Sequence, residues 1–247
     1  MENILENERI DDLEYKGLKI IQNKDGFCFG IDSILLSDFA SEIKRNSKVI
    51  DLGTGTGIIG IMLCAKTELS QMVGVEIQKE VYDMAKRSIK LNKLQHKFEI
   101  INDNIKNLEN IIEMGTFDAV VTNPPYKKVG TGITNENHKK LLSRHEITAN
   151  LEDFIKVSAK LLKDKGNLYM VHRPDRLVDI IEHLRKYKLE PKKIRFIEPS
   201  IGKEANLILI KATKNAKPFL KIEKTLYVYK ENGEYTNEIL KIYNKEK

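Results

Sequence analysis

The chain has 247 residues, of which 41% are hydrophobic and 32% charged, and its formal net charge is +6. This length suffices for one large α/β domain with a small appendage. No stretch approaches the roughly 20 apolar residues that a membrane span needs, and the acidic start MENILENERIDD lacks the apolar core of a signal peptide. The two cysteines, Cys28 and Cys64, stand far apart and the five histidines are scattered. We therefore expect no metal site and a reduced, cytoplasmic location.

The positive charge is confined to the C-terminal part of the chain. Residues 151–247 carry 22 Lys and Arg against 14 Asp and Glu, a net charge of +8, whereas residues 1–150 carry 20 against 22. Such an excess favours a polyanionic partner. A lysine-rich solvated surface explains the same charge equally well, so charge by itself does not choose between the two interpretations.

Short β-branched runs alternate with helical patterns along most of the chain. An amphipathic helix is predicted at 34–39. The first part of the alternation predicts strands at 48–52, 72–77, 98–101 and 117–121, and helices over 58–66, 79–92 and 105–112. After a long loop at 127–150, it predicts a helix over 151–162, a strand at 167–171, and a helix with Pro174 in its first turn that ends near 187. Two final strands are predicted at 192–199 and 204–212, joined by a turn at Gly202.

This alternation predicts a parallel, doubly wound sheet with ligands at the carboxyl ends of the strands. The short link between the last two strands predicts an antiparallel hairpin, whereas a dehydrogenase continues with βαβ units. The pattern resembles the Rossmann-like seven-stranded sheet of the class I S-adenosylmethionine-dependent methyltransferases. We expect a cofactor-flanking segment at 1–45, a methyltransferase domain at 46–213, and a tail at 214–247 that packs on the same domain.

Acidic residues end three consecutive predicted strands. Asp51 precedes the glycine turn of VIDLGTGTG (49–57), Glu76 ends the next strand 19 residues after Gly57, and Asp103 follows the third. Glycines in such a turn permit positive φ and a close approach of a ligand to the backbone. Their spacing departs from the G-x-G-x-x-G fingerprint, and an isolated glycine turn is often only structural. The ordered series of acids is what favours a ligand site.

These residues resemble the cofactor motifs of the class I methyltransferases. The resemblance implies that Gly53 and Gly55 lie under the methionine moiety of S-adenosylmethionine, that Glu76 holds the ribose and that Asp103 holds the adenine. Upstream, DGFCFGIDSILLSDFA (25–40) resembles the segment that closes over the methionine end in amino-methyltransferases. The implied cofactor residues are Phe29, Gly30, Asp32, Asp51, Gly53, Thr54, Gly55, Gly57, Glu76, Asp103 and Asn123.

The sequence Asn123-Pro124-Pro125-Tyr126 follows the fourth strand, where Asn and Pro are also common in ordinary turns. An exocyclic amine is a poor nucleophile because its lone pair is delocalised into the ring. The side-chain oxygen of Asn123 and the backbone carbonyl of a proline can accept from its two N–H bonds, and the prolines keep these acceptors in place. The ring of Tyr126 can stack on a base that has left its own stack. We therefore expect Asn123, Pro124, Pro125 and Tyr126 to be catalytic.

In known families this tetrapeptide serves adenine N6 and the side-chain amide of glutamine in release factors. The glutamine enzymes carry a helical substrate domain before the cofactor motifs, and guanine-N2 enzymes of ribosomal RNA usually have Phe at the place of Tyr126. Both fit this sequence less well. A non-catalytic RNA-binding module with the same fold stays possible, although such a module is expected to have lost an acid, a loop glycine or Asn123.

Three further segments, SRHE (143–146), VHRPDRL (171–177) and GKEANLILIK (202–211), narrow the resemblance. They are similar to the bacterial valine-tRNA adenine-N6 methyltransferases that modify A37, in the shorter branch common in Gram-positive bacteria. The similarity runs from about Gly17 to the C-terminus and includes the tail LYVYKENGEYTNEI. It implies tRNA as the substrate and no obligate protein partner. Guanidinium groups suit phosphate oxygens, which makes Arg144, Arg173 and Arg176 the candidate RNA contacts.

Overall fold

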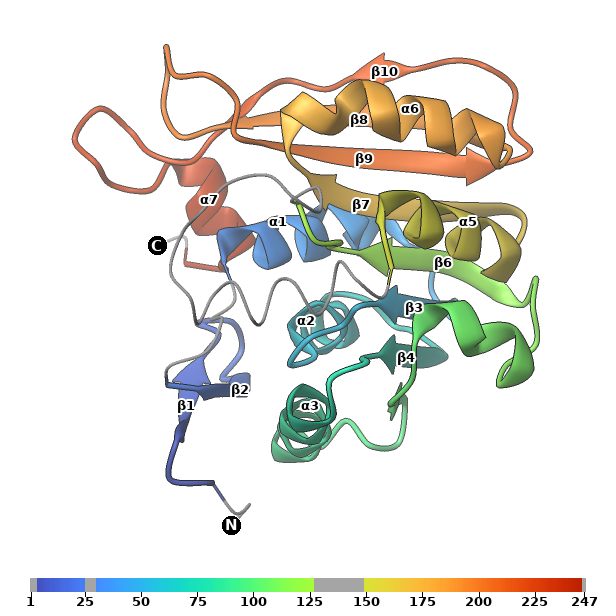
Figure 1. Ribbon diagram of the computed structural model, residues 1–247. Helices are drawn as coiled ribbons and strands as arrows, with labels where there is room; N and C mark the ends of the chain where they lie inside the picture. Colours follow the sequence, from blue (N-terminus) through green and yellow to red (C-terminus); the bar gives the residue numbers. More distant parts are fainter. Residues whose placement is uncertain (1–3, 25–29, 127–148, 246–247) are drawn as a thin grey trace.

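The computed structural model describes residues 4–24, 30–126 and 149–245 of the chain. Over these residues, nine strands form one sheet in the order β10-β8-β9-β7-β6-β3-β4-β5, with β11 also paired to β8. Figure 1 shows the succession from β10 to β4 across this sheet. The strands of this sheet are β3 (Lys48–Leu52), β4 (Gln71–Val75), β5 (Phe98–Ile101), β6 (Phe117–Thr122), β7 (Leu162–His172), β8 (Leu189–Glu198), β9 (Leu207–Lys214), β10 (Lys221–Ile222) and β11 (Leu226–Tyr227).

The seven predicted strands correspond to β3 through β9, so the predicted α/β fold class is confirmed. Neighbours from β5 to β7 are parallel, and β9 is antiparallel to both β7 and β8, as predicted for the C-terminal hairpin. Gly202 lies between the two hairpin strands with φ +80°. The short strands β10 and β11 were not predicted. They extend the sheet because β8 at its edge offers free backbone groups that the tail pairs with.

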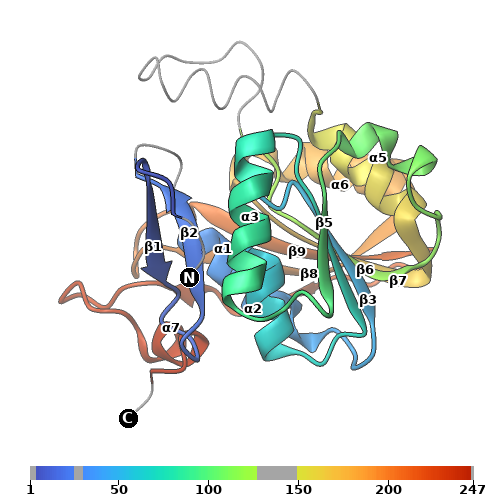
Figure 2. The same ribbon diagram turned by 90° about the horizontal axis from the view of Figure 1, so that it is seen from below.

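Helices cover both faces of the sheet, and Figure 2 shows α1, α2 and α3 on one side and α5 and α6 on the other. The helices are α1 (Ile31–Phe39), α2 (Ile58–Lys66), α3 (Lys79–Leu91), α5 (Leu151–Leu161), α6 (Leu177–Lys186) and α7 (Asn237–Ile242), with short 3₁₀ turns η1 (Ala40–Glu42), η2 (Ile105–Asn110) and η3 (Pro174–Arg176). Each side has its own cluster of buried apolar side chains. None of the described helices has the length and apolar composition needed to cross a bilayer.

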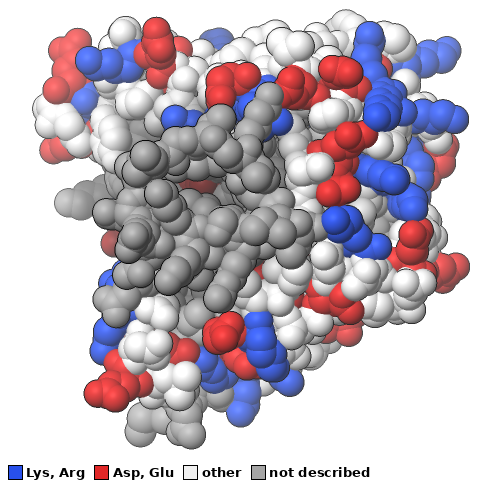
Figure 3. All heavy atoms as spheres, viewed as in Figure 1, with Lys and Arg blue, Asp and Glu red and all other residues white. Residues whose placement is uncertain are grey.

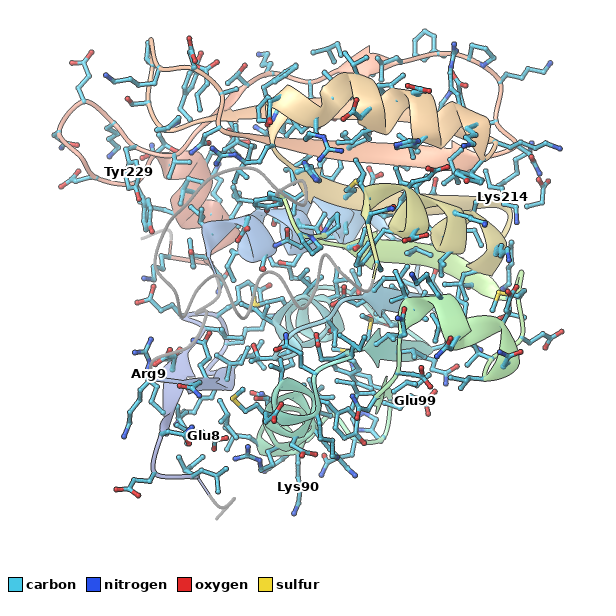
Figure 4. All side chains as sticks on the ribbon, viewed as in Figure 1. Glu8, Arg9, Lys90, Glu99, Lys214 and Tyr229 are labelled. Carbon is cyan, nitrogen blue, oxygen red and sulfur yellow. The ribbon has the colours of Figure 1, made fainter. Side chains whose placement is uncertain are left out.

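Both ends of the chain pack on the side that holds α1 and α2. The N-terminal part forms an antiparallel hairpin of β1 (Glu8–Asp12) and β2 (Lys19–Asn23), which was not predicted. Glu8, labelled in Figure 4, is 6% exposed. Its two carboxylate oxygens accept from the guanidinium of Arg87 on α3 at 2.5 and 2.6 Å. This hydrogen bonding lowers the pKa of the Glu8 carboxyl and ties the hairpin to the domain. At the other end, α7 buries Ile239 and Ile242 in the same apolar cluster.

The contact of α2 with the sheet depends on Gly60. A Cβ atom at this position would lie 2.4 Å from Cζ of Phe98 and 3.1 Å from Cε of Met72. Inside a helix, Gly→Ala ordinarily stabilises by up to about 1 kcal/mol. We expect the opposite sign here, a loss of about 1–3 kcal/mol in the free energy of unfolding from overpacking, measured by urea denaturation.

A double-mutant cycle isolates the cause. In a Phe98→Leu background the ring is gone, so Gly60→Ala should cost less than it does in the wild type. Stabilisation by Gly60→Ala alone would show that α2 does not pack this closely on β5.

Candidate active site

The site lies where three parallel strands end side by side. Leu52, the last residue of β3, pairs with Val75 of β4 on one side and with Thr122 of β6 on the other. The hydroxyl of Thr122 donates to the backbone oxygen of Leu52 at 2.8 Å, which locks two of these ends together. The next residues along the three strands are Gly53, Glu76 and Asn123. The register therefore brings together residues that are up to 70 positions apart in sequence.

The glycine turn between β3 and α2 takes a backbone path that other residues resist. Gly53 and Gly55 have φ of +71° and +58°, and Gly57 precedes α2 with φ +90°. At Gly53 a Cβ would also lie 3.4 Å from the ring of Phe154 on α5. The turn thus exposes backbone without side chains at the carboxyl ends of the strands, where a ligand can approach closely.

Glu76 holds the glycine turn as well as facing the site. It is 1% exposed, its Oε2 accepts from the backbone N–H of Gly55 at 3.0 Å, and its Oε1 accepts from that of Gln78 at 2.8 Å. Asn102 donates to the backbone oxygen of Glu76 at 2.8 Å, which links the ends of β4 and β5. These hydrogen bonds fix the direction of both carboxylate oxygens at the end of β4.

Asp51 is fully buried beneath the glycine turn. Its Oδ2 accepts from the hydroxyl of Thr54 at 2.7 Å, whereas Oδ1 is buried with no partner among the described residues. Burial raises the pKa of Asp51 to about 7, the Thr54 hydrogen bond opposes the shift, and the nearby charge of Glu76 adds to it. A buried oxygen without a donor is costly, which makes Asp51 a candidate to accept from a cationic or N–H group of a ligand.

A small cavity connects the ends of β3, β4 and β5. It is lined by Gly53, Val75, Glu76, Ile77, Asp103, Asn104, Ile105, Ala149 and Phe154. The cavity itself, at about 20 Å³, is far smaller than a nucleoside, but its lining combines apolar walls with carboxylates, the groups that contact a flat base and the donating ribose hydroxyls. Oδ1 of Asp103 is already an acceptor for the backbone of Asn104 at 2.6 Å and for Asn107 at 2.7 Å, and these contacts fix its direction. The described residues at this edge therefore fit the predicted cofactor.

Asn123 and Tyr126 converge on one carboxylate. Oδ2 of Asp32, in the first turn of α1, accepts from Nδ2 of Asn123 at 3.1 Å and from the hydroxyl of Tyr126 at 2.7 Å. Burial and the charge of Asp32 raise the pKa of Tyr126 well above its ordinary value, so its hydroxyl stays protonated. Between the two residues, Pro124 is buried and Pro125 half-buried, which fixes the corner. The sequence predicted each of these residues but not the bonds that join them.

His172 is a neighbour of the site that was not among the predicted site residues. It ends β7, is fully buried, and its ring centroid lies 5.1 Å from that of Tyr126. Its Nδ1 accepts from the backbone N–H of Arg173 at 2.8 Å, and Nε2 has no partner among the described residues. Burial, helped by the charge of Arg176, lowers the pKa of His172 to about 4, so the ring is neutral. Its position at the end of the strand beside β6 is the signal that points to it.

The candidate RNA contacts differ in their surroundings. Arg173 is exposed, whereas the guanidinium of Arg176 is paired with Asp179 at 2.7 Å. Arg144, like the predicted cofactor residue Phe29, lies outside the described residues. Figure 3 shows Lys and Arg interspersed with Asp and Glu over the face that it presents. Of the three arginines, Arg173 is thus the one that the structure shows as an exposed residue.

Comparison with known proteins gives the family. The family model described as "Methyltransferase small domain" matches residues 30–187. A tRNA1(Val) (adenine(37)-N6)-methyltransferase from Porphyromonas gingivalis is 28% identical over 204 residues, which are 81% of this chain and 79% of the relative. The protein of that name from Haemophilus influenzae is 24% identical and covers 92% of this chain and 94% of its own length.

Solved structures show the same fold. A predicted O-methyltransferase from Agrobacterium tumefaciens matches with a TM-score of 0.70 at 21% identity, covering 87% of this chain and 96% of that one. The TYW2 protein of M. jannaschii, solved with AdoMet, matches with a TM-score of 0.56 at 17% identity, covering 86% and 88%.

The family match extends from the start of α1 to the end of α6 and so includes the glycine turn, the acids and the Asn-Pro-Pro-Tyr corner. The predicted enzyme class, an S-adenosylmethionine-dependent methyltransferase, is confirmed at the level of the family. With its strand order, its site and more than half of its length matched, this chain belongs to the methyltransferase small domain family.

Proposed function

We propose that this protein transfers the methyl group of S-adenosylmethionine to N6 of an adenine in RNA, with A37 of a tRNA as the target. One observation carries the proposal. The amide of Asn123 stands at the carboxyl edge beside the cofactor residues, and its nitrogen is already engaged by Asp32. Its oxygen is therefore left to accept from a substrate amine. The names of the similar proteins from P. gingivalis and H. influenzae support adenine and tRNA as the finer choice.

The cofactor residues act by binding and orientation. The buried acceptors Glu76 and Asp51 take the hydroxyl and cationic donors of the cofactor, and the residues that line the cavity beside Asp103 contact the flat base. The bound cofactor supplies an electrophilic methyl group on a sulfonium. The glycine turn and Asn123 follow the ends of adjacent strands, so the residues that would hold the cofactor are next to the residue that would hold the amine.

The Asn-Pro-Pro-Tyr corner acts on the nucleophile. The reaction forms an N6–CH₃ bond, breaks a sulfur–CH₃ bond and releases one N6 proton to solvent. Acceptors at Asn123 and at a proline carbonyl polarise the N–H bonds and localise the lone pair on N6. The neutral His172 and the protonated Tyr126 bring no charge of their own beside the amine.

We further propose an RNA contact at Arg173, a cytoplasmic location and a division of the chain into three parts. The exposed Arg173 is adjacent to His172 in sequence and stands at the rim of the site, where phosphate contacts are needed. A tRNA substrate places the enzyme in the cytoplasm. The division into 1–45, 46–213 and 214–247 is supported by the burial of α7 in the same apolar cluster as α1 and α2.

Cofactor binding should depend on Glu76. Removing a charged acceptor of ribose hydroxyls costs about 1.5–3 kcal/mol, so Glu76→Ala should raise the Kd for S-adenosylmethionine at least tenfold in calorimetry. Glu80→Ala is the matched control, since Glu80 is an exposed acid at the start of α3. Equal affinities in the two variants would remove Glu76 from the cofactor site.

Methyl transfer should depend on Asn123 while cofactor binding does not. Loss of one preorganised acceptor costs about 3 kcal/mol, or on the order of a hundredfold in rate. Asn123→Ala should therefore lower kcat by that factor and leave the Kd for the cofactor near the wild-type value. Wild-type turnover in this variant would rule out the proposed contact with the amine.

The substrate class can be read from a lysate incubated with enzyme and labelled cofactor. We expect label in RNA as N6-methyladenine, mapped by mass spectrometry to position 37 of a tRNA. Methylation of a glutamine in a release factor would label protein instead and leave RNA unlabelled, which would end this proposal.

RNA binding should weaken steeply as salt rises, because phosphate contacts release counterions. Arg173→Glu should raise the Kd for tRNA and leave the Kd for the cofactor unchanged. Arg45→Glu is the control, since Arg45 is exposed and precedes β3, at the end of that strand opposite to the site. Equal losses in both variants would indicate a general charge effect rather than a contact at the site.

A further inference from the structure

We propose that Asp32 is a positioning residue that sets the direction of the Asn123 amide, and thereby selects a substrate that presents an amine. The inference rests on the proposed function and deepens it. The sequence resemblance had implied that Asp32 contacts the cofactor. The structure shows in addition that its carboxylate bonds to the two polar side chains of the Asn-Pro-Pro-Tyr corner.

Among the described residues, Asp32 accepts three hydrogen bonds, which use both of its oxygens. Oδ2 accepts from Nδ2 of Asn123 at 3.1 Å and from the hydroxyl of Tyr126 at 2.7 Å, and Oδ1 accepts from the backbone N–H of Ser33 at 3.0 Å. Asp32 is only 9% exposed. In such a poorly solvated place, hydrogen bonds to a charge are stronger than in water.

The chemistry of a carboxylate makes this arrangement directional. The amide of Asn123 has a donor end and an acceptor end, and an ionised carboxylate can only accept. The amide nitrogen must therefore face Asp32 and the oxygen must face away. No described residue donates to that oxygen. Asp32 thus turns the amide oxygen of Asn123 toward the substrate. An acceptor in this position suits the N–H bonds of an amine and repels a carbonyl oxygen.

Asp32 is itself held in place from three directions. It lies in the first turn of α1, where the positive end of the helix dipole favours a carboxylate. The helix is anchored by Ile34, Leu35 and Leu36, which are at most 1% exposed. At Gly30 a Cβ would lie 2.7 Å from Oδ1 of Asp32, so the absence of a side chain there makes room for the carboxylate.

Reversal of the polarity tests the inference. In Asp32→Asn, the backbone N–H of Ser33 faces the position of Oδ1 and favours oxygen there, which puts the new amide nitrogen where Oδ2 was. Asn123 must then turn its own oxygen inward and its nitrogen toward the substrate. We expect kcat to fall about a hundredfold with little change in the Kd for the cofactor.

The reciprocal exchange should restore the acceptor. In Asp32→Asn with Asn123→Asp, the amide at 32 donates inward and the carboxylate at 123 offers an oxygen to the amine. We expect kcat of the double variant to exceed that of Asp32→Asn by tenfold or more. A residue that served only to pack α1 would give no such rescue, so a double variant no faster than Asp32→Asn would overturn the inference.

Two variants control for nearby effects. Asp38→Asn changes another acid of α1, one that is bound to Lys66 and not to the corner, and should leave kcat unchanged. Tyr126→Phe removes one donor to Asp32 but retains the bond from Asn123, so its kcat should fall much less than that of Asp32→Asn. A Tyr126→Phe loss equal to that of Asp32→Asn would assign the effect to the tyrosine.

A readout without turnover separates this inference from the substrate assignment. In the nitrogen–proton correlation spectrum of the labelled protein, the Nδ2 resonances of Asn123 are the pair absent from Asn123→Asp. They should shift in Asp32→Asn and stay in place in Asp38→Asn. Equal behaviour in both would overturn the inference even if RNA is methylated, whereas a selective shift together with unlabelled RNA would end only the proposed substrate.

Discussion

The parallel register of three neighbouring strands is the constraint on which the rest of this site depends. Because Leu52 pairs with Val75 on one side and Thr122 on the other, the chain must leave the sheet at three adjacent points of one edge. A different type of residue follows each of the three strands. A glycine turn follows β3, a buried acid follows β4, and a proline corner follows β6. The glycines allow positive φ without a side chain, and the prolines restrict the backbone of the corner.

Burying polar groups at the carboxyl ends of these strands costs free energy, and hydrogen bonds from the described residues offset this cost only in part. Glu76 and Asp32 have two or more donors each, so their charges are stabilised by hydrogen bonds. Asp51 has one donor and His172 accepts one bond, and each keeps a buried polar atom without a partner among the described residues. Such atoms are rare in folded proteins outside functional sites. Because His183 on α6 also has such an atom, Asp51 and His172 are candidates for a ligand contact only through their position beside the glycine turn and the corner.

Several basic side chains of the C-terminal part are paired with acidic residues, so its net charge of +8 overstates the number of cations that can bind a polyanion. Lys193 and Lys211 both bind Glu42, and Arg195 binds Glu238 of α7, so these groups hold the hairpin and the tail to the domain. Exposed pairs of this kind add little stability individually. They do reduce the number of cations available to a polyanion. The position of an exposed arginine such as Arg173 is therefore a better guide to a phosphate contact than the sum of charges.

The sequence by itself determined the order of strands and helices, the C-terminal hairpin and the identity of the residues at the strand ends. These features follow from local patterns: period-two and period-3.6 hydrophobicity, and glycine or proline at the turns. Strands β10 and β11 escaped prediction because they have two residues each and form by pairing with β8. The β1–β2 hairpin is local, but it escaped prediction because β1, with the sequence ERIDD, is short and mostly charged.

Only the tertiary structure decided how the site residues act on one another. The sequence predicts Asp32 as a cofactor contact, and only the structure shows that it also bonds to Asn123 and Tyr126, which lie 91 and 94 positions further along the chain. Likewise, only the folded chain shows that Arg176 is paired and that the ring of His172 lies against Tyr126. A hydrogen bond between segments so distant leaves no periodicity in the sequence, because its geometry is set by how α1 packs on the sheet.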